Sequence, residues 1–208
     1  MLSRGRWAGQ RADNDVVTSL RGPAVPPGHL AQLAQPVLET GGLVLRPWRA
    51  SDAPAVAAAY ADPGIQRWHM RSMTLQEAGA WISAWPGRWH RETGAGWAVA
   101  GPAGVLGQIS LRRVNLVEGL GELSYWVLPT ARGQRVATRA LGALTGWAFG
   151  PLGLHRLELA HSTVNEASCG VARSAGYLLE GTKREEALHA DGWHDMHLHA
   201  RLASDPEL

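Results

Sequence analysis

Residues 128–138, LPTARGQRVAT, join a predicted strand to a predicted helix, and this junction decides the fold. The strand, over 119–128, alternates apolar and polar side chains and stops at Pro129. The helix, over 134–149, places Ala137, Leu141, Leu144 and Ala148 on one face. The short loop between them leaves backbone amides unpaired at a helix N-terminus, where they can face an anion.

The side chains of the same loop favour a phosphate-bearing ligand. Arg132 and Arg135 add formal positive charge to the partial charge of the helix end, and Thr138 supplies a hydroxyl. The pattern describes a diphosphate cradle, although neither the Walker spacing nor a dinucleotide fingerprint is present. Because Arg-Gly is common at helix starts, a purely structural loop is an equal alternative on this motif alone.

The sequence on either side alternates strands and helices. A strand over 156–161 completes a strand–helix–strand crossover with 119–149, and such crossovers are right-handed. Several strands precede this unit, so we expect an α/β protein with a mixed sheet. The remaining expectations are strands at 43–45, 97–100, 105–111, 177–180 and 194–201, helices at 53–60, 75–89 (behind a capping box at Thr74) and 166–175 (capped by Asn165), and a turn at 62–64.

Composition predicts one globular domain with an appendage. The chain has 208 residues, 45% of them hydrophobic, and a formal net charge of +2. Residues 1–40, with four prolines and no sustained periodicity, are expected to form a flexible N-terminal extension, and residues 41–208 the domain. Cys169, the single cysteine, excludes an internal disulfide.

The same composition disfavours several function classes. Positive charge is spread along the chain, which argues against nucleic-acid binding. No run of about 18 apolar residues predicts a membrane span, and the N-terminus has no apolar signal region, so we expect a cytoplasmic protein that binds no membrane.

Residues 42–203 resemble the GNAT acyltransferase superfamily, and most closely its RimJ/RimL-like branch of ribosomal-protein N-terminal acetyltransferases. The order and spacing of three blocks carry the resemblance over about 160 residues, which is far more specific than any one motif. The blocks are LVLRP (43–47) with SDA (51–53); GELSYWVL (121–128) with RGQRVAT (132–138); and NEAS (165–168) with AGY (175–177) and DGWHD (191–195).

The resemblance implies a GNAT fold, with a mixed central sheet of about six to seven strands, helices on both faces and a splayed central strand pair. It implies acetyl-CoA as co-substrate, with the pantetheine arm against the strand that ends at Leu128 and the diphosphate on the amides from Gly133 to Thr138. Asn165 would contact the pantetheine, and Ser168 would lie near the thiol. The cofactor-binding residues expected on this basis are Trp126, Val127, Leu128, Arg132, Gly133, Gln134, Arg135, Val136, Ala137, Thr138, Asn165 and Ser168.

Two positions depart from the family pattern. Arg135 stands where relatives usually have glycine, and we expect its guanidinium to turn outward to a phosphate. Ala172 stands where some relatives carry a tyrosine acid, so the proton returned to the thiolate would come from Ser168, a water or another residue.

Direct transfer to an amine needs a base and no covalent enzyme intermediate. Glu122, a carboxylate inside an apolar strand, is the first candidate for the base; Glu158, expected to pair with Arg156 or Arg173, and His161 are alternatives. Cys169 has no clear histidine partner in the sequence and is interpreted as a small buried residue. A metal site among His189, His194, His197 and His199 is disfavoured, so no metal is expected.

The sequence therefore predicts an acetyl-CoA-dependent N-acetyltransferase that acts on a primary amine, either a protein N-terminus or a small molecule. Loops at 67–73, 112–121 and 183–193 should select the acceptor. The alternative is a degenerate, non-catalytic domain that binds CoA and a protein partner. A homodimer is left open.

Overall fold

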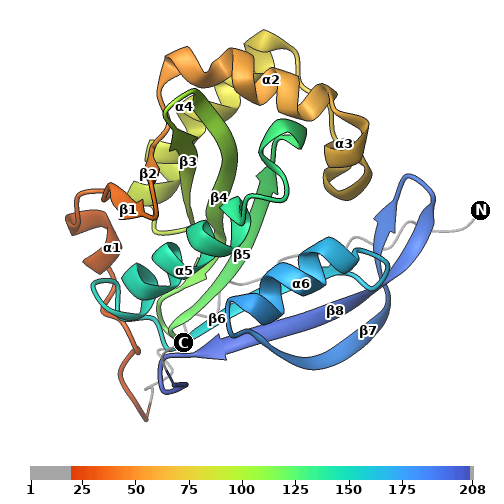
Figure 1. Ribbon diagram of the computed structural model, residues 1–208. Helices are drawn as coiled ribbons and strands as arrows, with labels where there is room; N and C mark the ends of the chain where they lie inside the picture. The colour runs from red at the N-terminus through yellow and green to blue at the C-terminus, as the bar shows by residue number, and fades with distance from the viewer. Residues whose placement is uncertain (1–19, 207–208) are drawn as a thin grey trace, which may run out of the picture.

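The computed structural model describes residues 20–206 as one mixed sheet with helices on both of its faces (Figure 1). The sheet has eight strands in the order β1-β2-β3-β4-β5-β6-β8-β7. The strands are β1 (Leu38–Thr40), β2 (Leu43–Pro47), β3 (Ala95–Gly101), β4 (Gly104–Asn115), β5 (Leu120–Val127), β6 (Arg156–Ser162), β7 (Leu178–His189) and β8 (Gly192–Leu202). Only β5 and β6 pair in parallel; the other neighbours are antiparallel, which confirms the expected mixed sheet.

The helices follow the expected pattern with two additions, α1 and α3. They are α1 (His29–Gln32), α2 (Ala53–Ala61), α3 (Pro63–His69), α4 (Leu75–His90), α5 (Val136–Phe149) and α6 (Glu166–Ser174), with 3₁₀ turns η1 (Ala50–Asp52) and η2 (Pro129–Ala131). In Figure 1, α5 and α6 lie in front of the sheet and α4 lies behind it. None of the helices within residues 20–206 is long and apolar enough to cross a bilayer.

Tryptophans form much of the core. Trp89 on α4, Trp97 on β3 and Trp147 on α5 pack against one another with ring centroids 5.5–6.2 Å apart. Trp97 is fully buried. A second apolar cluster joins α2, α3 and α4 to the end of β5, where Trp126 packs against Tyr60. This second cluster fixes α3 over the end of β5, and that placement matters for the site.

Residues 24–40 differ from the expectation of a flexible extension, because they pack onto the domain. Val25 and Leu30 are buried in the main core, and β1 pairs with β2. The indole amides of Trp89 and Trp97 donate to the backbone carbonyls of residues 33 and 36, at 3.1 and 2.9 Å. The extra strand β1 also raises the strand number to eight. Residues 1–19 lie outside the described part of the chain.

The expected turn at 62–64 is wrong, because these residues begin the helix α3. The Asp62 carboxylate accepts the amide of Ile65 at 2.9 Å, and Pro63 occupies the first helical position. Asp and Pro are common both in turns and at helix starts, so the sequence did not separate the two. The capping box at Thr74 and the Asn165 cap are confirmed. Asp52 makes no side-chain cap of α2; its carboxylate accepts the backbone amide of Arg49 at 2.9 Å and binds the Arg46 guanidinium.

Candidate functional site

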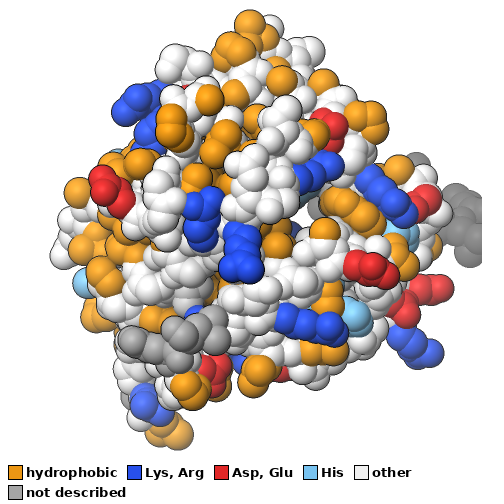
Figure 2. Space-filling view, viewed as in Figure 1, with side chains coloured by type: hydrophobic (Ala, Val, Ile, Leu, Met, Phe, Trp, Pro, Cys, Tyr) orange, Lys and Arg blue, Asp and Glu red, His pale blue; other side chains and the backbone are white. Residues whose placement is uncertain are grey.

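The two parallel strands separate soon after they meet. β5 and β6 pair at only three positions, the last of which joins Glu122 to Glu158, although β5 continues to Val127 and β6 to Ser162. Figure 1 shows β5 rising toward α3 while β6 runs beneath α6. A cavity of about 600 Å³ lies at this gap, lined by α3, the end of β5, the loop before α5, and α6. Figure 2 shows this face of the molecule hollowed, with basic side chains beside the opening.

Backbone groups of β5 face the gap. Leu128 donates its amide to Leu106 on β4 at 2.8 Å, so residues of the same parity, Trp126 among them, direct their backbone groups to β4. Tyr125 and Val127 therefore direct theirs toward the gap. Their carbonyls are reached by His69 Nε2 at 3.1 Å and by Arg132 Nε at 3.4 Å. The amides of these two residues are left to pair with a ligand.

The loop before α5 presents the predicted row of bare amides. Within residues 20–206, the backbone amides of residues 133–138 donate to no protein acceptor; the first bond of the helix runs from Arg139 to the carbonyl of Arg135. Gly133 (φ 76°) and Arg135 (φ 55°) both adopt left-handed backbone conformations, which turn the chain into the helix. A helix N-terminus with unpaired amides at a cavity wall is an anion site.

Arg135 adopts a backbone conformation that glycine adopts without strain. A side chain in the left-handed region costs about 1–2 kcal/mol, a penalty that glycine avoids. The side chain of Arg135 is exposed and lines the cavity, and its guanidinium has no hydrogen bond or ion pair among the described residues. The strain is thus accompanied by a free cation beside the amide row.

Most of the predicted cofactor residues come together in this cavity. Its lining includes ten of them: Trp126, Val127, Arg132, Gly133, Arg135, Val136, Ala137, Thr138, Asn165 and Ser168. Leu128 and Gln134 are outside the lining, because Leu128 packs on the α2–α4 cluster and the Gln134 amide side chain donates to Thr130. Arg132 is paired with Asp62 at 3.3 Å across the mouth of the cavity.

The structure does not bring Glu122 into the cavity lining. Its carboxylate is held by Arg113 at 3.1 Å and Arg112 at 3.6 Å. Glu122 stands in the last paired position of β5 and β6, about 10 Å along the strand from Tyr125. Glu158 pairs with Arg156 at 2.7 Å, as expected for the alternative base.

Two residues that the sequence did not single out line the cavity beside the gap. Burial lowers the pKa of His69 to about 4, with the nearby charges of Arg71 and Arg112 acting in the same direction, so the imidazole is neutral at physiological pH. Burial raises the pKa of Tyr125 to about 12, and its hydroxyl lies beside Ser168 without a well-aligned partner. His69 was missed because residues 62–64 were interpreted as a turn and 67–73 as an acceptor loop, so no helix was expected to hold it. Tyr125 was part of a quoted block but carried no assigned role.

Two of the predicted acceptor loops, 67–73 and 183–193, meet at a second hollow next to α3. His189 Nδ1 lies 3.1 Å from the carbonyl of Arg67, and the Arg67 guanidinium pairs with Asp191 at 3.5 Å. This second hollow, of about 600 Å³, lies between α3 and the turn from β7 to β8, lined in part by Arg67, Arg71 and Asp191. The third loop, at 112–121, is outside both linings.

Comparison with known proteins identifies similar domains. Residues 42–178 match the family model described as "Acetyltransferase (GNAT) domain". The chain is 33% identical over 88 residues to the "Putative ribosomal N-acetyltransferase YdaF" of Bacillus subtilis (strain 168), which covers 42% of the chain and 48% of that relative. It is 29% identical over 98 residues to the ribosomal-protein-serine acetyltransferase of Escherichia coli (strain K12), or 47% of the chain and 55% of that relative.

The chain thus spans about half the length of these two relatives. Among solved structures, RimL, a ribosomal L7/L12 alpha-N-protein acetyltransferase in complex with coenzyme A, superposes with a TM-score of 0.76 at 19% identity, over 82% of this chain and all of that one. The likeness confirms the α/β fold class expected from the resemblance.

Proposed function

Because the chain belongs to the GNAT acetyltransferase family, we propose that it transfers an acetyl group from acetyl-CoA to a primary amine in the cavity at the β5–β6 gap. The observation that carries the proposal is the row of unpaired amides at residues 133–138, which opens into that cavity. These amides and Arg135 would hold the diphosphate. The solved RimL structure, which contains coenzyme A, supports this choice of ligand.

The pantetheine arm would occupy the gap itself. Its amides would pair with the backbone of Tyr125 and Val127 in the manner of an added strand, which makes up for the β6 partner that these residues lack. Asn165 and Ser168 would contact the arm from α6, as the resemblance implies. This arrangement would put the thioester near the carbonyl of Tyr125, three residues beyond the last pair between β5 and β6.

The chemistry is direct attack of a neutral amine on the thioester carbonyl. A C–N bond forms, the C–S bond breaks, and the nitrogen loses a proton. We assign the proton acceptor to His69: Nε2 donates to the Tyr125 carbonyl, so Nδ1 carries the lone pair, and the lowered pKa keeps the ring neutral. The nitrogen of the tetrahedral adduct carries a positive charge and would pass its proton to that lone pair.

The departing sulfur needs hydrogen-bond donors. Tyr125 supplies a buried hydroxyl that stays protonated at physiological pH, and Ser168 lies beside it. This pair would take the place of the helix tyrosine that some relatives have where this chain has Ala172, which is fully buried in the core. Glu122, which Arg112 and Arg113 hold outside the cavity lining, has no part in the proposed step.

The acceptor that we favour is a protein N-terminus, as the names of the ribosomal relatives suggest. The second hollow shares Arg67 with the cavity lining, and we propose that the peptide lies there, between α3 and the β7–β8 turn. Arg67 and Arg71 there would favour acidic side chains after the first residue. A small-molecule amine is the competing acceptor.

The test is an acetyl-transfer assay on the purified chain with acetyl-CoA and a panel of peptides and small amines. Release of the CoA thiol and the added acetyl mass on the acceptor are both measured. Arg135→Ala should raise the KM for acetyl-CoA, whereas Arg91→Ala, an exposed arginine on the far end of α4, should not. If the chain binds CoA and acetylates no amine, the non-catalytic alternative replaces the enzyme.

A further inference from the structure

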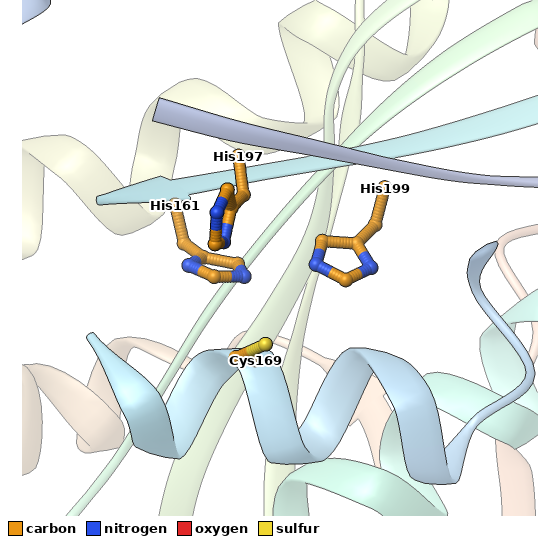
Figure 3. A group of neighbouring side chains, drawn as sticks. All are labelled: His161, Cys169, His197 and His199. Atoms are coloured by element: carbon orange, nitrogen blue, oxygen red, sulfur yellow. The ribbon is translucent and has the colours of Figure 1, made fainter. Parts of the chain in front are cut away.

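A cluster of nitrogen and sulfur atoms lies between α6 and the sheet, outside the cavity lining. His161 on β6, His197 and His199 on β8, and Cys169 on α6 each offer one ligand atom, and these four atoms lie within 4.8 Å of one another. Figure 3 shows the three imidazoles grouped beneath the strands and the Cys169 sulfur pointing toward them from the helix. The cluster therefore has the composition of a four-ligand metal site.

The sheet register creates this cluster. His161 pairs with His197 across β6 and β8, and His199 lies opposite Leu159, so all three imidazoles leave the same face of the sheet. That face is covered by α6, whose contacts with β6 and β7 hold Cys169 above the histidines. The expectation that Cys169 has no histidine partner is wrong, because only the pairing of two strands distant in sequence reveals one.

Three nitrogens in the cluster are buried and have no hydrogen-bond partner: His161 Nε2, His197 Nδ1 and His199 Nε2. His161 and His199 are 5% and 0% exposed, so solvent does not satisfy them. An unpaired buried polar atom costs about 1–3 kcal/mol, and three in one place point to a missing partner.

The opposite ring nitrogens fix the tautomers. His161 Nδ1 donates to the carbonyl of Ser162 at 2.8 Å, and His199 Nδ1 donates to the carbonyl of Tyr177 at 3.1 Å. Each bond leaves the lone pair on Nε2, which faces the cluster. Backbone carbonyls behind ligating imidazoles are a regular feature of protein metal sites.

We propose that His161, Cys169, His197 and His199 bind one zinc ion. One thiolate and three neutral imidazoles are a closed tetrahedral donor set for zinc. In such a site neighbouring donor atoms are about 3.4 Å apart, so the four atoms, which now lie within 4.8 Å of one another, would close by up to about 1.4 Å. The Cys169 thiol releases its proton on binding, and the site then carries one net positive charge. Exposed Arg173 is the nearest cation acting on His161 and His199.

The ion would fix α6 to β6 and β8. α6 also presents Asn165 and Ser168 to the cavity, so the zinc would hold one wall of that cavity in place. The sequence, which predicts no metal, did not indicate this role. Zinc binding does not depend on acetyl transfer, so its test stands apart from the test of the enzyme.

The test uses the full chain, purified without an oligohistidine tag and then loaded with zinc or cobalt. We expect one zinc per chain by elemental analysis. The cobalt form should show the strong visible absorption of a tetrahedral site and a thiolate-to-cobalt charge-transfer band. Cys169→Ser should remove that band and weaken zinc binding at least about tenfold, while exposed His90→Ala changes neither. At a hundred times its dissociation constant, zinc should raise the Tm by about 5–10 °C.

Wild-type chain alone can overturn the proposal, even if the variants fold poorly. An octahedral cobalt spectrum, or no more than trace zinc after loading, would refute it. Equal zinc binding by a folded Cys169→Ser variant would also refute it, because the ion would then sit on surface histidines. Zinc binding with wild-type affinity by a His161→Ala and His199→Ala double variant would refute the proposal as well.

Discussion

Replacing Arg135 by glycine separates the two roles of this residue, backbone strain and positive charge. The left-handed conformation at φ 55° costs a non-glycine residue about 1–2 kcal/mol. Glycine removes this cost, but its greater conformational entropy in the unfolded chain offsets about half of the gain in stability. We expect Arg135→Gly to stabilise the free protein by about 1 kcal/mol. For a chain of this length that is a Tm increase of about 2–4 °C.

The same substitution should weaken coenzyme binding. The Arg135 guanidinium lines the cavity and has no partner among residues 20–206. A charge-assisted hydrogen bond to a phosphate contributes about 1.5–3 kcal/mol, and the exposure of this side chain places it at the lower end. Loss of about 1.5 kcal/mol raises the dissociation constant of CoA about tenfold.

Two further variants separate the effect of backbone strain from the effect of the positive charge. Arg135→Ala keeps the strain and loses the charge, so CoA binding should weaken without a gain in Tm. Glu185→Gly relieves a left-handed residue (φ 46°) on β7, outside the cavity lining, so the Tm should rise with CoA affinity unchanged. Calorimetric titration with CoA and thermal unfolding of the free protein measure both. Wild-type CoA affinity in Arg135→Gly would refute the phosphate contact, and a lower Tm would refute the strain.

Three other substitutions probe the fold and the reaction. Asp52→Ala should lower the free energy of unfolding by about 3 kcal/mol in denaturant titration. The substitution leaves the Arg46 guanidinium, which Asp52 binds at 2.7 and 2.8 Å, without its buried partner. An unchanged denaturation midpoint would contradict this stabilising role of the ion pair. His69 has a pKa of about 4 in the folded chain against about 6.5 in the unfolded chain, so the unfolded state binds more protons between these pH values. The wild type should therefore lose about 3 kcal/mol of stability as the pH falls from 6.5 to 4, and His69→Gln should lose about 3 kcal/mol less over the same range. Parallel curves of stability against pH for the two proteins would refute the lowered pKa of His69. Tyr125→Phe should lower kcat about tenfold in the transfer assay with CoA affinity retained, and an unaffected kcat would remove the hydroxyl from the mechanism.

Local patterns predicted the parts of the site that lie close together in sequence. Alternation up to Pro129 and the helical stripe of α5 determined the strand, the loop and the helix start, and the bare amides follow from that geometry alone. The β5–β6 gap came from the resemblance, and its position follows from the three-residue pairing that ends at Glu122. Neither the length of that pairing nor the parity that turns Tyr125 toward the gap is encoded in local periodicity.

Functional contacts between distant segments were not predictable in the same way. His69 reaches β5 only because Asp62 caps a helix rather than a turn, and Cys169 meets its histidines only through the β6–β8 register. Glu122 shows the reverse case: a carboxylate in an apolar strand suggested a base, but two arginines from β4, a strand neighbour, hold it. Local sequence predicts elements well and leaves open which side chains share a space.

The segment 24–40 tests whether contacts that the sequence did not predict are needed for folding. A chain that begins at residue 41 contains the whole domain expected from the sequence and lacks only these contacts. Loss of the segment would remove the burial of Val25 and Leu30, about 2 kcal/mol each. It would also remove the acceptors of the Trp89 and Trp97 indole amides, which water would replace, at a net loss of about 0.5–1.5 kcal/mol each. The sum, about 5–7 kcal/mol, is comparable to the whole stability of an ordinary domain.

We therefore expect the chain beginning at residue 41 to be largely unfolded by circular dichroism at 25 °C, while one beginning at residue 20 keeps all four contacts and unfolds cooperatively. The comparison isolates residues 20–40, since the two chains are otherwise identical. A cooperative transition of the shorter chain, with a Tm within a few degrees of that of the longer chain, would show that α1 and β1 contribute little to stability. The hydrogen bonds from the Trp89 and Trp97 indole amides would then contribute little to the free energy of unfolding.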